Sequence, residues 1–172
     1  YDNTALASLA IDYLQSCGHR TIAVAHGPKH ESDRMVARCE GVILATSPQN
    51  AASFVEVELS VEGGREAAKR ILQLTPRPTA ILCLSDVLAL GVMFQVQCVG
   101  LTIPDDISIM GFDNLDWSKV SHPSLTTIDL PATQMGEVAA RSVVDQLENG
   151  ISLKSVSLSA NILVRNSVKS AT

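Results

Sequence analysis

The sequence has few aromatic residues, no basic run and no long apolar stretch. Only 3% of its 172 residues are aromatic, and 13 basic residues stand against 18 acidic ones, for a formal net charge of −5. Nucleic-acid-binding surfaces need clustered positive charge, so this segment is not expected to touch DNA itself. No stretch approaches the ~20 apolar residues of a membrane-spanning helix, and the start has no signal-peptide pattern. We therefore expect no membrane contact.

Four cysteines occur, and their spacing indicates neither a disulfide framework nor a metal site. Cys17, Cys39, Cys83 and Cys98 form no CxxC pair, and each lies in an apolar or helical context. Free cysteine in such surroundings behaves as a small buried hydrophobic residue. We therefore expect reduced, buried cysteines and a cytoplasmic location.

Apolar strands and amphipathic helices alternate along the chain. The expected helices, the first of them capped by Asn3, are 4–17, 34–46, 62–74, 87–99 and 132–148. The expected strands are 21–25, 54–57, 79–84 and 107–112, followed by two short β-like segments near 155–158 and 161–165. This alternation predicts an α/β fold, a doubly wound parallel sheet with right-handed crossovers.

Polar residues follow three of the predicted strands. They are His26, Ser85 with Asp86, and Asp113 with Asn114. Ligands of doubly wound sheets bind beyond the carboxyl ends of the strands, so a site is expected there. Carboxylates accept hydrogen bonds from ligand hydroxyls and guanidinium groups donate to oxygens. Asp113 with Arg38 or Arg34 would therefore suit a polyol, a sugar or an anionic metabolite.

Each of these residues also has a plain structural role open to it. Asp113 could be a turn residue after a strand, and Asp86 could be a helix cap. Arg34 and Arg38 lie four residues apart on one helix face with glutamates nearby, as on a solvated face. The residue types alone leave both alternatives open.

Catalysis and metal binding find little support in the motifs. Ser85, Asp86, Asp113 and His26 could share one rim, as a Ser/His/Asp hydrolase requires, but the chain has no G-x-S-x-G nucleophile elbow. The four histidines show no HxxH or HExxH spacing. We predict no catalytic residue, no metal site and no cofactor.

The helix expected at 87–99 is apolar nearly all round. Only Gln95 and Gln97 carry polar side chains between Val87 and Val99. A helix of this kind must be covered on more than its sheet side. A deep core and a subunit interface are the two explanations.

Eight short motifs follow one another from the first helix to the end of the chain. In order they are Gly18–Ala23, Gly27–Pro28, Arg38–Gly41, Arg77–Ile81, Ser85–Gly91, Gly100–Asn114, Pro123–Ile128 with Met135–Gly136, and Val164–Ser167. Together they cover essentially the whole chain. In this order they resemble the effector domain of the LacI/GalR family of bacterial transcriptional regulators.

The resemblance implies the C-terminal lobe of a periplasmic-binding-protein-like clamshell of type I. Such a domain closes on a small-molecule effector, such as a sugar, nucleoside or related metabolite, and alters the affinity of a separate headpiece for operator DNA. Residues 1–172 resemble only the C-terminal part, because the headpiece and most of the first lobe have no counterpart here. Operator DNA would be bound only through that N-terminal headpiece, which accounts for the acidic charge of this segment.

The family's ligand contacts carry over to particular positions. The candidate ligand-binding residues are Arg38, Asp113, Ser85, Asp86, Arg34 and Ser32. Arg38 matches the arginine of the R-x-x-G motif and Asp113 the strand-end aspartate, whereas Ser85 stands where many sugar-binding members carry Asn. Leu59 falls where many members place an aromatic ring, so stacking on a flat ligand is not expected there.

Two further expectations come from the resemblance. The family pairs through the helix that begins at Asp86 and the loop after Asp113, so we predict a homodimer with Leu90, Phe94 and Val120 at its interface. The helix 132–148 is expected to belong to the absent N-terminal lobe and therefore to repack, to be disordered or to pair with another copy. A solute-binding protein of a transporter is the alternative function, and an α/β hydrolase comes third.

Overall fold

The fold was obtained as a computed structural model, which describes residues 1–47, 50–152 and 154–171. Its helices are α1 (Asn3–Ser16), α2 (Asp33–Ala45), α3 (Val61–Ile71), α4 (Asp86–Cys98) and α5 (Ala132–Asn149), with short 3-10 turns η1 (Lys29–Glu31) and η3 (Asp116–Lys119). Its strands are β1 (Ile22–His26), β2 (Ser53–Glu56), β3 (Ala80–Cys83), β4 (Ser108–Asp113), β5 (Thr126–Asp129) and β6 (Asn161–Leu163).

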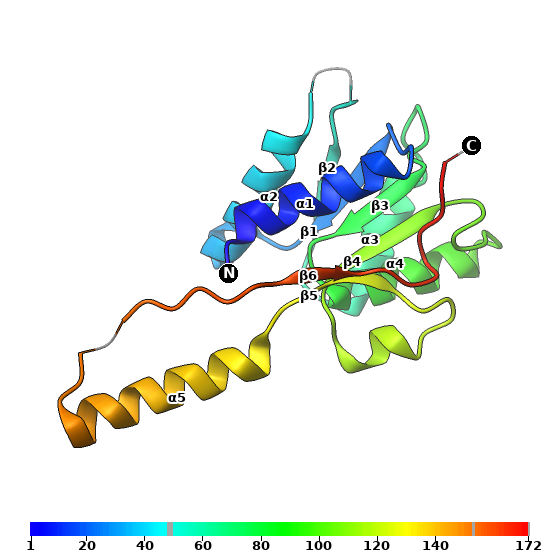
Figure 1. Ribbon diagram of the computed structural model, residues 1–172. Coiled ribbons are helices and arrows are strands. Elements are labelled where there is room, and N and C mark those ends of the chain that lie inside the picture. The colour runs from blue at the N-terminus through cyan, green and yellow to red at the C-terminus, as the bar shows by residue number, and fades with distance from the viewer. Residues whose placement is uncertain (48–49, 153, 172) are drawn as a thin grey trace.

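The strands form one twisted sheet through the centre of the molecule (Figure 1). Their order is β2-β1-β3-β4-β5-β6 over the described residues, and the neighbours pair in parallel except for β6, which runs antiparallel to β5. The predicted doubly wound α/β fold is confirmed, and the parallel strands bring the carboxyl ends of β1, β3 and β4 to one edge.

Alternate residues of each central strand face opposite layers of helices. Val24, Leu82 and Met110 lie in one buried cluster with residues of α1 and α2, whereas Ala25 and Ile81 lie in another with residues of α3 and α4. A strand covered on both faces has no polar side to show, which is why these strands are continuous apolar runs.

Glycine allows α3 and α4 to lie very close together. A Cβ on Gly91 would collide with the carbonyl oxygen of Val61, and one on Gly64 with that of Leu88. Gly64 therefore serves helix packing in the first turn of α3, after its N-cap Ser60, whereas a Cβ on Gly63 would collide with the carbonyl oxygen of Glu58 in the preceding loop.

The helix α5 and the chain that returns from it form an arm, residues 132–152 and 154–158, that projects from the body (Figure 1). No residue of α5 is buried, and Met135, Val143, Val144 and Leu147 are exposed apolar side chains on it. None of the described helices is long and apolar enough to cross a membrane.

Several local expectations were wrong. Asp2, and not Asn3, caps α1, because its Oδ1 atom accepts from the amides of Thr4 and Ala5. Cys39 and Cys83 are buried as expected, but Cys98 is exposed at the end of α4. Residues 155–158 form no strand, because β6 alone pairs with the body at that edge of the sheet within the described chain.

Candidate ligand-binding site

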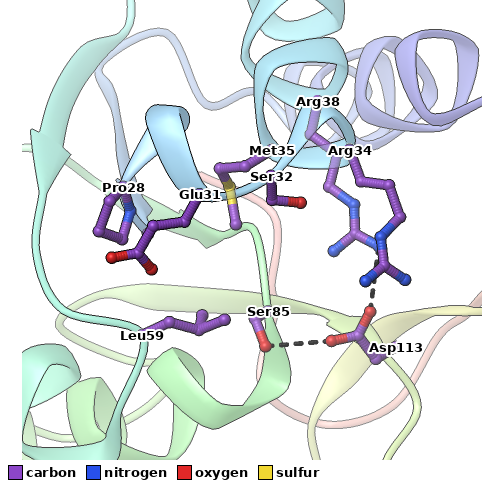
Figure 2. Close-up of a pocket in the computed structure, with 10 residues that line it drawn as sticks. Pro28, Glu31, Ser32, Arg34, Met35, Arg38, Leu59, Ser85 and Asp113 are labelled. Carbon is purple, nitrogen blue, oxygen red and sulfur yellow. Dashed lines mark hydrogen bonds and ion pairs between the residues drawn. The ribbon is translucent and has the colours of Figure 1, made fainter.

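An open cavity of about 300 Å³ lies at the carboxyl ends of β1, β3 and β4, beside the start of α2 (Figure 2). It is lined by Gly27, Pro28, Glu31, Ser32, Arg34, Met35, Arg38, Leu59, Ser85 and Asp113. Five of the six predicted ligand-binding residues thus lie on one cavity. The crossovers of the doubly wound sheet gather them from segments far apart in sequence.

Arg38 is the buried cation of this cavity, and its guanidinium is fixed from several sides. Its Nη2 atom lies 3.2 Å from Oδ1 of Asp113, its Nε donates to Oδ1 of Asn3 at 3.0 Å, and its Nη1 donates to the carbonyl oxygen of Leu84 at 2.7 Å. The guanidinium carbon lies 3.8 Å from the centroid of the Phe112 ring. Burial lowers the pKa of Arg38, and the Asp113 carboxylate opposes that shift. The hydrogen bonds, the ion pair and the stacking on Phe112 together hold the charge in one place and orientation.

Asp113 presents a carboxylate that is anchored on both oxygens yet reaches the cavity. Its second oxygen accepts a hydrogen bond from Oγ of Ser85 at 3.0 Å, and 26% of its side chain is exposed. Burial raises the pKa of Asp113, and the charge of Arg38 opposes this. The oxygens keep free lone pairs that a ligand hydroxyl can use.

Ser85 has two roles at this edge of the sheet. It is the N-cap of α4, and its Oγ accepts from the amide of Val87 at 3.3 Å while donating to Asp113. The cap therefore sets the side chain in the rotamer that meets Asp113. A ligand that approaches the carboxylate meets the hydroxyl of Ser85 as well.

Asp86 lies behind the cavity, with no exposed surface. Its Oδ2 accepts from the amide of Leu115 at 2.8 Å and its Oδ1 from the hydroxyl of Thr127 at 2.7 Å. Burial raises its pKa to about 6, and a Cβ on Gly111 would collide with its carboxylate. The structure gives Asp86 a supporting position, and its contact with a ligand stays a prediction.

The rim is polar on one side and apolar on the other. Arg34 is exposed at the rim and Ser32 is half-buried, and the hydroxyl of Ser32 makes no capping bond to α2. Met35 and Leu59 supply apolar surface (Figure 2). No aromatic ring lines the cavity among the described residues, and Leu59 presents an aliphatic side chain to it.

The sequence did not reveal two residues that hold the site together. Asn3 was predicted to be a helix cap, but its side-chain oxygen accepts a hydrogen bond from Nε of Arg38. Phe112 alternates with Asp113 on β4, so its ring faces the α1–α2 layer, where Arg38 stacks on it. The alternation of a strand is the signal that could have placed Phe112 beside Arg38.

The structure does not assemble a catalytic triad. His26 is buried, with its Nδ1 atom 2.8 Å from the carbonyl oxygen of Gly27 and 3.9 Å from a carboxylate oxygen of Glu56. In the described chain, the side-chain hydrogen bonds of Ser85 run to Asp113 and Val87 and none reaches His26. No group of three or more His, Cys, Asp or Glu in the described residues could hold a metal ion.

A second cavity, an apolar groove of about 200 Å³, lies between α4 and the segment 117–122. It contains all three residues that the resemblance places at a dimer interface, Leu90, Phe94 and Val120, together with Trp117. Phe94 is 52% exposed and Val120 77% exposed. One face of the apolar helix α4 is therefore buried core, and the other is open.

A doubly wound sheet with Arg, Asp and Ser around an open cavity at its strand ends is a small-molecule-binding domain. Comparison with known families gives the same answer, because the model of the periplasmic binding protein-like domain matches residues 11–168. The chain belongs to this family, in the form that LacI-type regulators carry, as the motifs had indicated.

Individual relatives agree with this assignment. The chain is 36% identical over 154 residues to the HTH-type transcriptional repressor CytR of Escherichia coli K12, covering 86% of this chain and 44% of that protein. It is 34% identical over 168 residues to the repressor PurR of Vibrio campbellii, covering 94% of this chain and 49% of that protein.

A solved structure extends the agreement to the fold. The LacI family transcriptional regulator of Enterococcus faecalis V583, crystallised with bound ribose, superimposes with a TM-score of 0.91 at 27% identity, covering 99% of this chain and 62% of that one. The chain spans about half the length of the curated relatives it matches, CytR and PurR.

Proposed function

We propose that this chain is the effector-binding and dimerisation part of a cytoplasmic, non-enzymatic LacI-type transcriptional regulator. The observation that carries the proposal is the pairing of Arg38, Asp113 and Ser85 on one cavity at the strand carboxyl ends. Its anchored carboxylate and guanidinium offer acceptors and donors to a hydroxylated metabolite such as a sugar or nucleoside.

Effector binding is tested with D-ribose, the ligand found in the Enterococcus faecalis regulator. Asp113→Asn is expected to weaken ribose binding about tenfold, because it removes a charged acceptor. Asp116→Asn is the matched control, because the Asp116 side chain is fully exposed on the next loop. Titration followed by nuclear magnetic resonance detects weak binding, and equal effects of the two variants would contradict the assignment.

A single lobe is expected to bind its effector more weakly than a whole clamshell does. One lobe supplies about half of the contacts of a clamshell and cannot close to exclude water. A nucleoside panel, with adenosine, cytidine and uridine, should accompany ribose in the titration. A parent chain that binds none of them would contradict the effector class proposed here.

The groove on α4 is proposed to pair with a second copy of the chain. Leu90→Asp places a charge in the groove and should shift the mass measured by light scattering from dimer to monomer. Leu44→Asp is the matched control, since Leu44 is 74% exposed on α2, on the other face of the sheet. A Leu90→Asp variant that keeps the parent's mass would overturn the dimer.

The arm is proposed to belong to the N-terminal lobe of the clamshell. The relatives are longer than this chain, and the arm's apolar side chains Met135, Val143 and Leu147 find no cover in the body. Operator DNA would be contacted by a headpiece upstream of Tyr1. Mass spectrometry of the native gene product tests both points by searching for peptides upstream of Tyr1, and a natural start at Tyr1 would contradict them.

The solute-binding protein of a transporter is not favoured. The curated relatives reported above are transcriptional repressors, and the ribose-bound neighbour is a transcriptional regulator. Hydrolysis is not proposed, because Ser85 pairs with a carboxylate instead of a histidine base. Turnover of an ester or glycoside that is lost in Ser85→Ala would contradict the non-enzymatic assignment.

A further inference from the structure

The end of β4 has an unusual backbone. Asp113 has a φ of 120° and Asn114 a φ of 56°, and neither is glycine. Asn tolerates the left-handed region, whereas Asp at 120° is strained. Strained residues at a binding site persist only where their surroundings hold them. The question is what holds this turn, because it sets the direction of the Asp113 carboxylate.

The side chain of Asn114 is at the centre of a hydrogen-bond cluster. Its Nδ2 donates to Oδ1 of Asp129 at 2.8 Å. Its Oδ1 accepts from Nη2 of Arg165 at 2.7 Å and from Oγ of Ser118 at 3.2 Å. Arg165 also donates to Oγ of Ser118 at 3.0 Å and to the carbonyl oxygen of Leu125 at 2.7 Å. One amide therefore joins three separate segments.

Two of these segments adjoin the connections between the body and the arm. Asp129 is the last residue of β5, after which the chain leaves for α5, and Arg165 follows β6, along which the chain returns. The third segment is η3, whose Ser118 lies next to Trp117 of the apolar groove. The residue after the candidate ligand carboxylate thus contacts a residue next to each arm connection and the loop of the groove.

We propose that Asn114 is a positioning residue that holds the Asp113 carboxylate toward its ligand and links occupancy of the cavity to the two arm connections. This inference rests on the proposed function, because it needs a ligand at Asp113. When a ligand hydroxyl donates a hydrogen bond to that carboxylate, the strained turn moves. The bonds of Asn114 to Asp129 and Arg165 then move together, because a single side chain makes both.

A reciprocal exchange of side chains tests the link. Asn114→Asp keeps a residue that tolerates positive φ and still accepts from Arg165, but it sets two carboxylates against each other at Asp129. In the double variant Asn114→Asp/Asp129→Asn, the amide at position 129 donates back to the carboxylate at 114. Asp129→Asn alone is the control, because its amide oxygen can still accept from Asn114.

Ribose binding to the 172-residue chain is the first measurement. Asn114→Asp should weaken binding about tenfold, the loss expected for one hydrogen bond to a charged group. The double variant and Asp129→Asn should bind within about threefold of the parent on the same reasoning. Binding in Asn114→Asp that equals the parent would overturn the positioning role.

Hydrogen exchange at the arm connections is the second measurement, and a purely structural role would not produce its result. In the parent and the double variant, ribose should change exchange at residues 129–131 and 163–166. In Asn114→Asp that response should be lost even at saturating ribose. A response of parental size there would overturn the link. If Asn114→Asp does not fold, Asn114→Gly keeps the backbone conformation, removes the side chain and takes its place.

The failure of this inference can be told apart from a failure of the proposed function. If the parent chain binds neither ribose nor the nucleosides, the proposed effector class fails. The cluster is then judged in the free protein, where Asn114→Asp should speed exchange at 129–131 and 163–166 and the double variant should restore the parental rate. Unchanged exchange in Asn114→Asp would overturn the role of Asn114 by itself.

Discussion

The body and the arm of this molecule contain similar proportions of apolar residues but differ in what covers these residues. In the body, helices such as α1 and α4 bury Leu14, Leu88 and their neighbours completely against the sheet. In the arm, α5 is amphipathic and well formed, yet it buries no residue, and Leu147 on it is 80% exposed. The pattern of a helix therefore states which face needs a partner but does not supply the partner.

The energetic consequence is that the two regions depend on different sources of stability. Burial of apolar surface stabilises the body, at roughly 25 cal/mol per Å² removed from water. The arm has its helix propensity and the returning chain beside α5, whereas most helical stability in proteins comes from packing of an amphipathic face against a core. The same kind of substitution should therefore change the free energy of unfolding by different amounts in the body and in the arm.

Truncation of a buried side chain should give the largest difference. Leu82 is completely buried in the central strand β3, so Leu82→Ala should lower the free energy of unfolding by about 2–5 kcal/mol. Val143→Ala, on the exposed stripe of α5, should leave it unchanged within about 0.5 kcal/mol. Urea denaturation measures both, and equal losses would show that the arm is packed as the body is.

A methyl group added at glycine should act with opposite signs in the two regions. Gly91→Ala drives a Cβ into the carbonyl oxygen of Val61 and should cost about 1–3 kcal/mol of unfolding free energy. Gly136→Ala in α5 meets nothing within 4 Å and should raise the helicity of the arm, by about 1 kcal/mol of helix propensity. Circular dichroism and urea unfolding separate the two effects, and a loss of stability in Gly136→Ala would contradict the open arm.

Titration of histidine should report on the body alone, because the arm contains no histidine. His19 is buried between Oγ1 of Thr79 and the carbonyl oxygen of Lys169, and burial lowers its pKa. A lowered histidine pKa means that the unfolded chain takes up the proton first. The contribution of His19 is therefore present above its ordinary pKa of about 6.5 and is lost on acidification, by at most about 1.4 kcal/mol per pH unit.

The measurement compares the free energy of unfolding of each variant with that of the parent chain at two pH values. His19→Gln should cost more unfolding free energy at pH 7.5 than at pH 5.0. Asp86→Asn should show the reverse, because burial raises the pKa of Asp86 to about 6 and its contribution is lost as the pH rises through that value. A cost of His19→Gln that is constant with pH would contradict the buried, neutral imidazole.

Much of the body could be predicted from the sequence because its determinants are local. Continuous apolar runs gave β1, β3 and β4 within one or two residues, and the helices α1, α2 and α4 began within one residue of their expected starts. The helix α3 ends at Ile71, three residues before its expected end. The Arg38–Asp113 pair came from the family's motifs, and the geometry places the two charged groups together.

The errors fall where structure depends on distant partners. The strand β5 was not predicted, because Thr126 and Thr127 are polar, yet both are buried, and their hydroxyls contact Arg165 and Asp86. A strand near 155–158 was predicted from composition, but a strand needs a neighbour to pair with, and those residues lie on the arm. The cluster around Asn114 was missed for the same reason, since its members come from four segments.

The arm finds no partner surface in the described body of this chain. Hydrogen exchange of the monomeric chain, compared between α5 and α4, is the decisive experiment. We expect amides of α4 to exchange only through global unfolding and amides of α5 to exchange through local opening at far lower free energy. Protection of α5 equal to that of α4 in a monomer would contradict it, because the arm would then have found cover within the body.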